Sequence, residues 1–209
     1  METPQPRKSS KSISILCLGD SYTKGEGIDL SLSFPYQLKD SIIQSGYAVS
    51  ELKVIAQTGW TTNNLIQAVS NASISNSYDI VTLLIGVNNQ YQGRSIDEYE
   101  SEFIQLATEA IEYARGDKSN VLIISIPDYG YTPFGSNNQP AISNAIDLFN
   151  SSNKRLADSL GLTYTDITPI TRLGLQQPNL VAGDNLHPSG LCYSLWLNQF
   201  LPILKMKLQ

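Results

Sequence analysis

The sequence predicts one three-layer α/β/α domain built on a parallel sheet, and three observations carry this prediction. The chain has 209 residues, which is enough for one large domain and marginal for two. Strand-like and helix-like patterns alternate five times along it. The strand-like runs are continuously apolar, which is typical of parallel strands covered on both faces. No internal repeat or linker divides residues 13–209, and the polar residues 1–12 are predicted to form a disordered leader.

The predicted strands are five short apolar runs, each bounded by turn residues. They cover residues 13–18, 52–56, 80–85, 121–126 and 162–167. The first run stops at Gly19 and places the hydroxyl of Ser21 just beyond its end, before a glycine-rich loop over residues 22–27. In an open α/β sheet, ligands bind at the carboxyl ends of the strands. Ser21 therefore stands where this class of fold carries out its chemistry.

Helical patterns separate the strands and follow the last one. They cover residues 34–43, 62–69, 95–114, 142–160 and 191–204. Thr61 or Thr62 is expected to cap the second helix, and Ser95 with Glu98 has the spacing of a capping box at the start of the third. Gly161 is expected to close the fourth helix. Residues 127–140, which precede that helix, form a predicted long loop rich in proline, glycine, asparagine and tyrosine.

Composition narrows the classes of function. Hydrophobic residues make up 41% and charged residues 16% of the chain, as in ordinary globular proteins. The formal net charge is -5, which argues against binding nucleic acid or an anionic membrane surface through bulk charge. Nothing in the sequence resembles a metal-ligand or disulfide framework, so no cofactor is expected. No stretch is long and apolar enough to span a membrane. Residues 1–12 lack the apolar core of a secretory signal, so a cytoplasmic location is expected; the oligomeric state is left open.

Residues that can activate a serine are present in the predicted loops. A serine hydroxyl is a poor nucleophile until a base takes its proton, and imidazole suits that task near neutrality. His187 is the only histidine in the chain, so it is the one histidine that could activate Ser21. Asp184, three residues earlier, could accept the other N–H of the imidazole and fix its tautomer. Gly59 and Asn88 follow the second and third strands, where a backbone amide or an asparagine side chain could stabilise an oxyanion.

This set of residues resembles the SGNH hydrolases, also called GDSL-type esterases and lipases. Four blocks stand in family order and bracket residues 19–188: Gly19-Asp20-Ser21-Tyr22, Gly59, Gly86-Val87-Asn88, and Asp184-Asn185-Leu186-His187-Pro188. The resemblance implies a flavodoxin-like sandwich with five parallel strands. That implied fold agrees with the fold predicted from the apolar pattern alone.

The resemblance also implies a role for each residue. Ser21 is the nucleophile, His187 the base and Asp184 the group that orients the histidine, while the amides of Ser21 and Gly59 and the side chain of Asn88 form the oxyanion hole. The implied reaction is hydrolysis of a small-molecule carboxylic ester through an acyl-enzyme, with no metal or organic cofactor. An acyltransferase or thioesterase with the same machinery is the alternative. A catalytically silent binding protein on this fold is a further hypothesis, because fold alone does not give function.

Two positions depart from the family pattern, and other motifs have ordinary alternatives. Tyr22 stands where the name-giving motif has leucine, and Asn89 stands where aspartate is frequent. The glycines of residues 25–27 do not have the spacing of a dinucleotide or phosphate loop. Taken singly, each proposed site residue would be a cap or turn residue, since serine, aspartate and asparagine favour such positions. Only the joint pattern favours catalysis.

Aromatic residues near the predicted site leave two interpretations open. Tyr129, Tyr131 and Phe134 lie in the long loop, where they could line a pocket for an acyl chain or a sugar. Aromatic residues in a long loop also commonly pack that loop onto its own domain. Tyr91 and Arg94 follow Asn88 and are expected at the surface, with substrate contact as the alternative.

Overall fold

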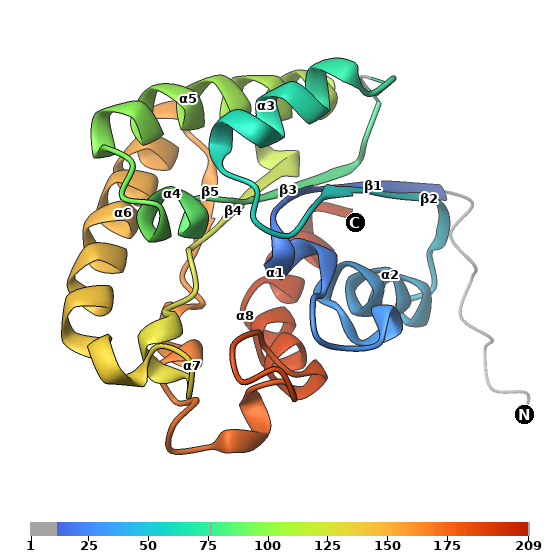
Figure 1. The fold of residues 1–209 in the computed structure, drawn as a ribbon. Helices are drawn as coiled ribbons and strands as arrows, with labels where there is room; N and C mark the ends of the chain where they lie inside the picture. The colour runs from blue at the N-terminus through green and yellow to red at the C-terminus, as the bar shows by residue number, and fades with distance from the viewer. Residues whose placement is uncertain (1–11, 76, 209) are drawn as a thin grey trace, which may run out of the picture.

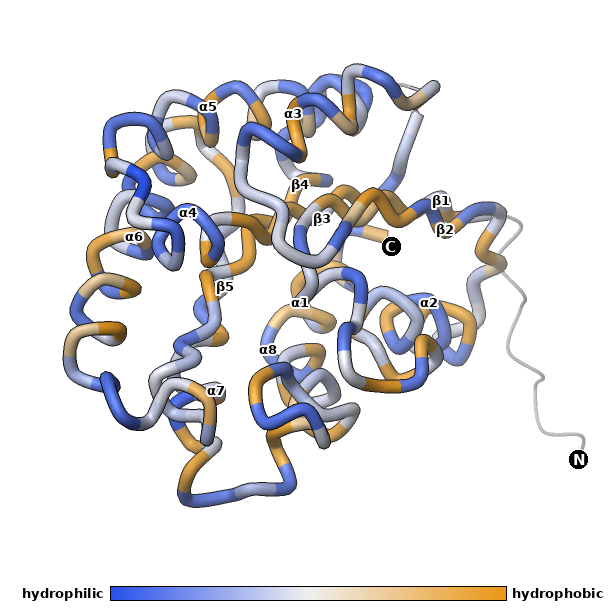
Figure 2. The backbone as a smooth tube through the Cα atoms, in the orientation of Figure 1, coloured by the Kyte–Doolittle hydropathy of each residue, from blue (hydrophilic) through white to orange (hydrophobic). Residues whose placement is uncertain are grey.

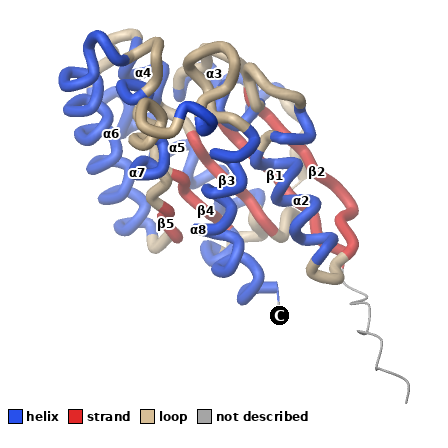
Figure 3. Tube along the Cα trace, turned by 90° about the horizontal axis from the view of Figure 1, so that it is seen from below, coloured by secondary structure: helices blue, strands red, loops and turns tan. Residues whose placement is uncertain are grey.

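A sheet of five parallel strands lies at the centre of the computed structural model, which describes residues 12–75 and 77–208 (Figure 1). The strand order is β2-β1-β3-β4-β5, and each neighbouring pair is parallel. The strands are β1 (Ser12–Gly19), β2 (Ala48–Ala56), β3 (Ile80–Leu84), β4 (Val121–Ile124) and β5 (Thr163–Thr165). Viewed from below, β2 and β5 are the two edges of the sheet (Figure 3). The predicted α/β class and five-stranded parallel sheet are confirmed.

Helices cover both faces of this sheet. Helices α3 and α5 lie together over one face, α2 and α8 lie together over the other, and α6 packs beside α5 and β5 (Figure 1). The α-helices are α1 (Ser21–Lys24), α2 (Phe34–Gln44), α3 (Thr62–Asn71), α4 (Val87–Tyr91), α5 (Ile96–Tyr113), α6 (Gln139–Leu160), α7 (Thr168–Thr171) and α8 (Gly190–Leu208). Short 3-10 turns are η1 (Leu30–Leu32), η2 (Lys118–Asn120), η3 (Tyr129–Tyr131), η4 (Ser136–Asn138) and η5 (Pro178–Leu180). None of the described helices has the length and apolar character needed to cross a membrane.

The core lies on both sides of the central strands. Consecutive residues of β1, Ile15 to Leu18, are all 0% exposed, although their side chains point alternately to opposite faces. Figure 2 shows hydrophobic residues running through these strands. Burial on both faces is the physical reason why the strands read as continuous apolar runs. All five strands are parallel, so their carboxyl ends lie along the same edge of the sheet.

Aromatic side chains anchor α8 to the first half of the chain. Phe34 of α2 packs against Tyr193, Trp196 and Phe200 of α8, with ring centroids 6.1, 6.3 and 6.4 Å apart. All four rings are buried, and each aromatic pair adds about 0.5–1.5 kcal/mol beyond its buried area. Residues 181–189 lead directly into α8, so this packing also fixes the position of that segment.

Several boundaries differ from the sequence prediction for local reasons. Strand β2 begins at Ala48, four residues before the predicted start at Leu52, because the edge segment 48–51 is polar enough to hide its pairing with β1. Strand β4 ends at Ile124, since Ile126 already donates its N–H to Asn150 Oδ1 at 2.7 Å. The predicted leader, residues 1–12, lies outside the described residues except for Ser12, which begins β1.

Candidate active site

The predicted site residues gather around one cavity at the carboxyl ends of β1, β2 and β3. The cavity holds about 190 Å³. Its lining includes Ser21, Gly59, Asn88 and His187, four of the five predicted site residues. The remaining wall is formed by Tyr22, Thr58, Val87, Tyr91, Tyr129, Phe134 and Leu186. Asp184 lies behind His187, outside the lining.

Ser21 is held at the start of one short helical turn. Asp20 caps this turn by accepting a hydrogen bond from Tyr22 N at 3.0 Å, and Gly25 ends it with a φ of 85°. The sequence prediction had a loop over residues 22–27, because four residues are too few to show helical periodicity. Ser21 itself is only 4% exposed but faces the cavity. The cap is therefore supplied by Asp20, which leaves the Ser21 hydroxyl free for other contacts.

His187 and Asp184 lie on a tight turn that precedes α8. Val181 and Pro188 pair as an antiparallel bridge across the turn, and Ala182 N donates to His187 O at 2.7 Å. Asp184 Oδ2 lies 2.6 Å from His187 Nδ1. Its other oxygen, Oδ1, accepts hydrogen bonds from Leu186 N and His187 N, each at 3.0 Å. The turn thus brings a carboxylate and an imidazole together and fixes both.

The environment of Asp184 favours its charged form. Burial acts to raise the pKa of this carboxyl, but the hydrogen bonds from His187 and Leu186 outweigh burial and hold the pKa below its ordinary value. An ionised Asp184 accepts the Nδ1–H of His187. The opposite nitrogen, Nε2, then carries a lone pair that can take a proton.

Tyr22 contacts the imidazole of His187 from the same short helical turn that carries Ser21. Its ring centroid lies 5.3 Å from that of His187, and the side chain is 3% exposed. Tyr193 of α8 donates its hydroxyl to Tyr22 O at 2.8 Å. Sequence reasoning noted Tyr22 only as a departure from the family pattern. Its position shows that Tyr22 packs between the turn that carries Ser21, the ring of His187 and α8.

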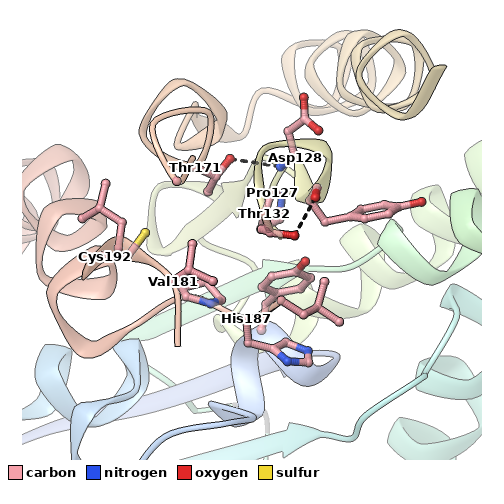
Figure 4. Close-up of a pocket in the computed structure, with 13 residues that line it drawn as sticks. Pro127, Asp128, Thr132, Thr171, Val181, His187 and Cys192 are labelled. Atoms are coloured by element: carbon pink, nitrogen blue, oxygen red, sulfur yellow. Dashed lines mark hydrogen bonds between the residues drawn. The ribbon is translucent and has the colours of Figure 1, made fainter. Parts of the chain in front are cut away.

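A second, much smaller cavity lies behind the histidine, with a volume of about 20 Å³ (Figure 4). Figure 4 shows His187 at its edge, with Cys192 and Val181 on one side and Asp128 and Thr171 on the other. Such a space holds about one water molecule. The larger cavity in front of His187 is the one with room for a substrate group.

Asn88 and Gly59 both line that larger cavity. Asn88 Nδ2 donates one N–H to Trp60 O at 3.0 Å, which ties the end of β3 to the loop after β2. An amide nitrogen has two N–H donors, so one remains for a ligand. Gly59 is exposed, with a φ of 83°. The two residues are thus linked through Trp60.

Asn89, the other departure from the family pattern, has a clear structural role. Its side chain is fully buried, accepts a hydrogen bond from Thr62 N at 3.0 Å and donates one to Thr62 Oγ1 at 2.6 Å. Thr62 Oγ1 in turn binds Glu102 of α5. Thr61, one of the two predicted caps, is the residue that closes a capping box with Asn64 at the start of α3. Asn89 therefore holds α3 in place and does not face the cavity.

The structure separates the aromatic candidates. Tyr91, Tyr129 and Phe134 line the cavity and contact one another, with centroids 6.0 to 6.3 Å apart. Tyr91 and Phe134 are 59% and 52% exposed. Tyr131 is half-buried and does not belong to the cavity lining. Arg94 forms an ion pair with Glu98 at 3.6 Å on the surface.

One expected contact is absent. Across residues 12–75 and 77–208, no hydrogen bond joins the Ser21 hydroxyl to the His187 ring, although both groups face the same cavity. Hydrogen bonds between groups that act together in catalysis are often long or poorly aligned in the absence of substrate. Within the same described residues, no cluster of three or more histidine, cysteine or acidic side chains is arranged to hold a metal ion.

Asp20, the residue before Ser21, is a buried acidic residue. Its side chain is fully buried, and Oδ2 has no hydrogen-bond partner among the described residues. Burial raises the pKa of this carboxyl from 3.8 to about 7, although hydrogen bonds from Tyr22 N and its own backbone act to lower it. The folded protein therefore holds this proton up to about pH 7, whereas the unfolded chain releases it near pH 4.

This difference in pKa between the folded and unfolded states makes the free energy of unfolding depend on pH. Between pH 4 and 7 the folded state binds more protons at Asp20, so the contribution of Asp20 to the free energy of unfolding falls as pH rises. Asp20→Asn removes this contribution and keeps the helix cap, because asparagine is an equally good cap. We compare the free energies of unfolding of Asp20→Asn and the wild type at pH 4.5 and at pH 8. We expect the value for the variant minus that for the wild type to be higher at pH 8 by about a few kcal/mol. Urea unfolding at both pH values measures this, and a constant difference would contradict it.

The fold agrees with the resemblance to the SGNH hydrolases that the four sequence blocks carry. The family model of the GDSL-like lipase/acylhydrolase family matches residues 17–195, and the chain belongs to this family. It is therefore an enzyme of the esterase and lipase class. No curated protein matches the chain.

Solved structures with the same fold include several esterases. A member of the lipolytic G-D-S-L family from Veillonella parvula is 18% identical, with a TM-score of 0.71, and the match covers 93% of this chain and 99% of that one. An acetyl xylan esterase variant from Geobacillus stearothermophilus is 20% identical, with a TM-score of 0.72 and 94% and 96% covered. The psychrotrophic esterase EstA from Pseudoalteromonas, inhibited by monoethylphosphonate, is 16% identical, with a TM-score of 0.66 and 93% and 98% covered.

Proposed function

We propose that this protein hydrolyses a carboxylic ester of an uncharged alcohol through an acyl-enzyme on Ser21. One observation carries the proposal. Ser21, Gly59, Asn88 and His187 line a single cavity, and Asp184 holds the far nitrogen of His187 at 2.6 Å. This is the set of groups that acyl transfer needs: a nucleophile, a base with an orienting carboxylate, and donors for an oxyanion.

The reaction follows from these positions. His187 Nε2 takes the proton of Ser21 as Oγ forms a bond to the carbonyl carbon, and Asp184 stabilises the imidazolium. The amides of Ser21 and Gly59 and the free N–H of Asn88 Nδ2 bind the oxyanion. His187 then gives its proton to the leaving alcohol as the ester bond breaks. Water attacks the acyl-enzyme by the same sequence and releases the acid.

The lining of the cavity supports an uncharged substrate. Of the residues that form its wall, none is aspartate, glutamate, lysine or arginine. Lys24, which hydrogen-bonds Thr58 at the rim, is already paired with Glu26 at 2.8 Å. A thioester of a polyanionic carrier would lack a cationic partner there, so an ordinary ester is favoured over the thioesterase alternative. The exposed rings of Tyr91 and Phe134 suit either an acyl chain or a sugar ring, and the Geobacillus neighbour makes an acetylated carbohydrate one candidate.

Covalent labelling tests the nucleophile directly. A fluorophosphonate probe should add to the intact protein once, and peptide mass spectrometry should place the adduct on Ser21. The probe reacts with an activated serine, and the Pseudoalteromonas esterase with this fold is inhibited by a phosphonate. Ser21→Ala should not be labelled, and heat-unfolded wild type is the control for non-specific reaction. Absence of labelling would favour the silent binding protein, and an adduct on another residue would contradict Ser21 as the nucleophile.

A further inference from the structure

The turn after α1, residues 25–27, contacts three parts of the site. Its backbone is tied to the nucleophile residue, because Gly25 N and Glu26 N donate to Ser21 O at 2.9 and 3.1 Å. The Glu26 carboxylate accepts hydrogen bonds from Lys24 Nζ at 2.8 Å and from Thr58 Oγ1, next to Gly59. The same hydrogen bonds, from Lys24 first and Thr58 second, lower the pKa of Glu26 and keep it charged. The turn is therefore fixed on the side of the nucleophile and on the side of the oxyanion donors.

Gly27, the last residue of this turn, lies directly against Asp184. A Cβ atom on Gly27 would lie 2.4 Å from Asp184 Oδ2, 2.8 Å from Cγ and 3.3 Å from Oδ1. Ordinary contacts of a Cβ atom are longer than 3.4 Å. The backbone of Gly27 also has a φ of 81°, in the region that favours glycine. Any other residue would therefore press on the carboxylate that holds His187.

Neither Asp184 nor the turn of residues 25–27 can move away from this contact without disturbing its other hydrogen bonds. Asp184 has three hydrogen bonds, to Leu186 N, His187 N and His187 Nδ1. The turn has its bonds to Ser21, Lys24 and Thr58. A methyl group at residue 27 must displace either the Asp184 carboxylate or the turn from the position that these hydrogen bonds hold. Aspartate has a short side chain, so a shift of Oδ2 directly changes its distance to Nδ1.

We propose that Gly27 is a positioning residue, whose missing side chain sets the place of the Asp184 carboxylate and through it the orientation of His187. The inference rests on the proposed function for its catalytic consequence, but the contact itself does not depend on that function. It also gives a reason for Gly27 within residues 25–27, whose glycines do not have the spacing of a phosphate loop. Here the glycine makes room for a carboxylate that belongs to the protein itself.

Gly27→Ala tests the proposal, with Gly116→Ala as the matched control. Gly116 has a φ of 78°, close to that of Gly27, but a Cβ there would meet no atom within 4 Å. Both variants carry the same backbone strain, and only Gly27→Ala presses on Asp184. We expect kcat for p-nitrophenyl acetate to fall about 10²-fold in Gly27→Ala, with KM nearly unchanged, and to stay within about twofold in Gly116→Ala, since small displacements of catalytic groups cost about this much.

Proton NMR gives a readout that is independent of turnover. The chain has one histidine, so the downfield Nδ1–H resonance comes from His187 alone. It should move upfield or broaden in Gly27→Ala and remain in Gly116→Ala. An unchanged resonance together with wild-type kcat in Gly27→Ala would overturn the proposal. So would equal losses of activity in the two variants.

A double-variant experiment covers the case in which Gly27→Ala folds poorly. In an Asp184→Ala background the carboxylate is absent, so the added methyl group has space. We expect Gly27→Ala to lower the urea midpoint in the wild type clearly more than in the Asp184→Ala protein, where its cost should equal that of Gly116→Ala. Equal costs in both backgrounds would overturn the contact. Because this readout is stability, it separates failure of the inference from failure of the proposed reaction, which the fluorophosphonate labelling of Ser21 tests.

Discussion

Ser21→Ala is expected to lower kcat for p-nitrophenyl acetate by at least about 10⁴-fold. Without the hydroxyl no acyl-enzyme forms, and only binding and oxyanion stabilisation remain to accelerate attack by water. In a serine hydrolase this residual effect is about 10³–10⁴-fold over the uncatalysed reaction. Steady-state turnover, corrected for spontaneous hydrolysis, measures the loss. A variant that keeps turnover within tenfold of the wild type would contradict Ser21 as the nucleophile.

The fold should survive this change, which makes the result interpretable. Asp20 caps α1, and across the described residues the Ser21 hydroxyl has no hydrogen-bond partner. We therefore expect the free energy of unfolding to change by less than about 1 kcal/mol. Thr23→Val is the matched control, because Thr23 lies in the same helical turn and its buried hydroxyl also has no partner. That variant removes a nearby hydroxyl outside the cavity lining and should keep full turnover.

The central strands could be predicted because their burial leaves a strong sequence signal. Every position of β3 (residues 80–84) and β4 (residues 121–124) is buried. These strands can therefore be recognised from a continuous apolar run alone. The edge strand β2 has a mixed burial pattern, and the strand is longer than the apolar part of the sequence. The short helices α1, α4 and α7 were not predicted. Four or five residues cannot show helical periodicity, and such turns are stabilised by caps and tertiary contacts.

The candidate site could be predicted in part, and the difference has a physical reason. Ser21, Asp184 and His187 have distinctive chemistry, so their spacing along the chain was informative. The contribution of Tyr22 and Gly27 depends on which residue folds against them, and that information lies in the tertiary structure. Gly27 in particular acts through an absent side chain. Nothing in residues 25–27 identifies Asp184, more than 150 residues later in the chain, as the group for which space is left.

Asp184→Asn should have the second largest effect, a loss in kcat of about 10³–10⁴-fold. Asparagine has nearly the same shape, and its oxygen can still accept the N–H groups of Leu186 and His187. Its NH₂ group, however, would then face His187 Nδ1, which has to become an acceptor. The proton moves to Nε2, and the imidazole can no longer take the proton of Ser21. Turnover of p-nitrophenyl acetate near neutral pH measures the loss.

The pH range of this effect follows from the state of Asp184 in the wild type. Its pKa lies below the ordinary value, so the carboxylate stays charged throughout the range in which an imidazole acts as a base. Its contribution is lost only as pH falls below about 4, and the difference between wild type and variant should therefore persist from pH 6 to 8. Asp40→Asn, on the exposed face of α2, is the control for loss of one negative charge. If both aspartate variants keep wild-type kcat, the Asp184 contact only shapes the turn, and His187 must be oriented by another group.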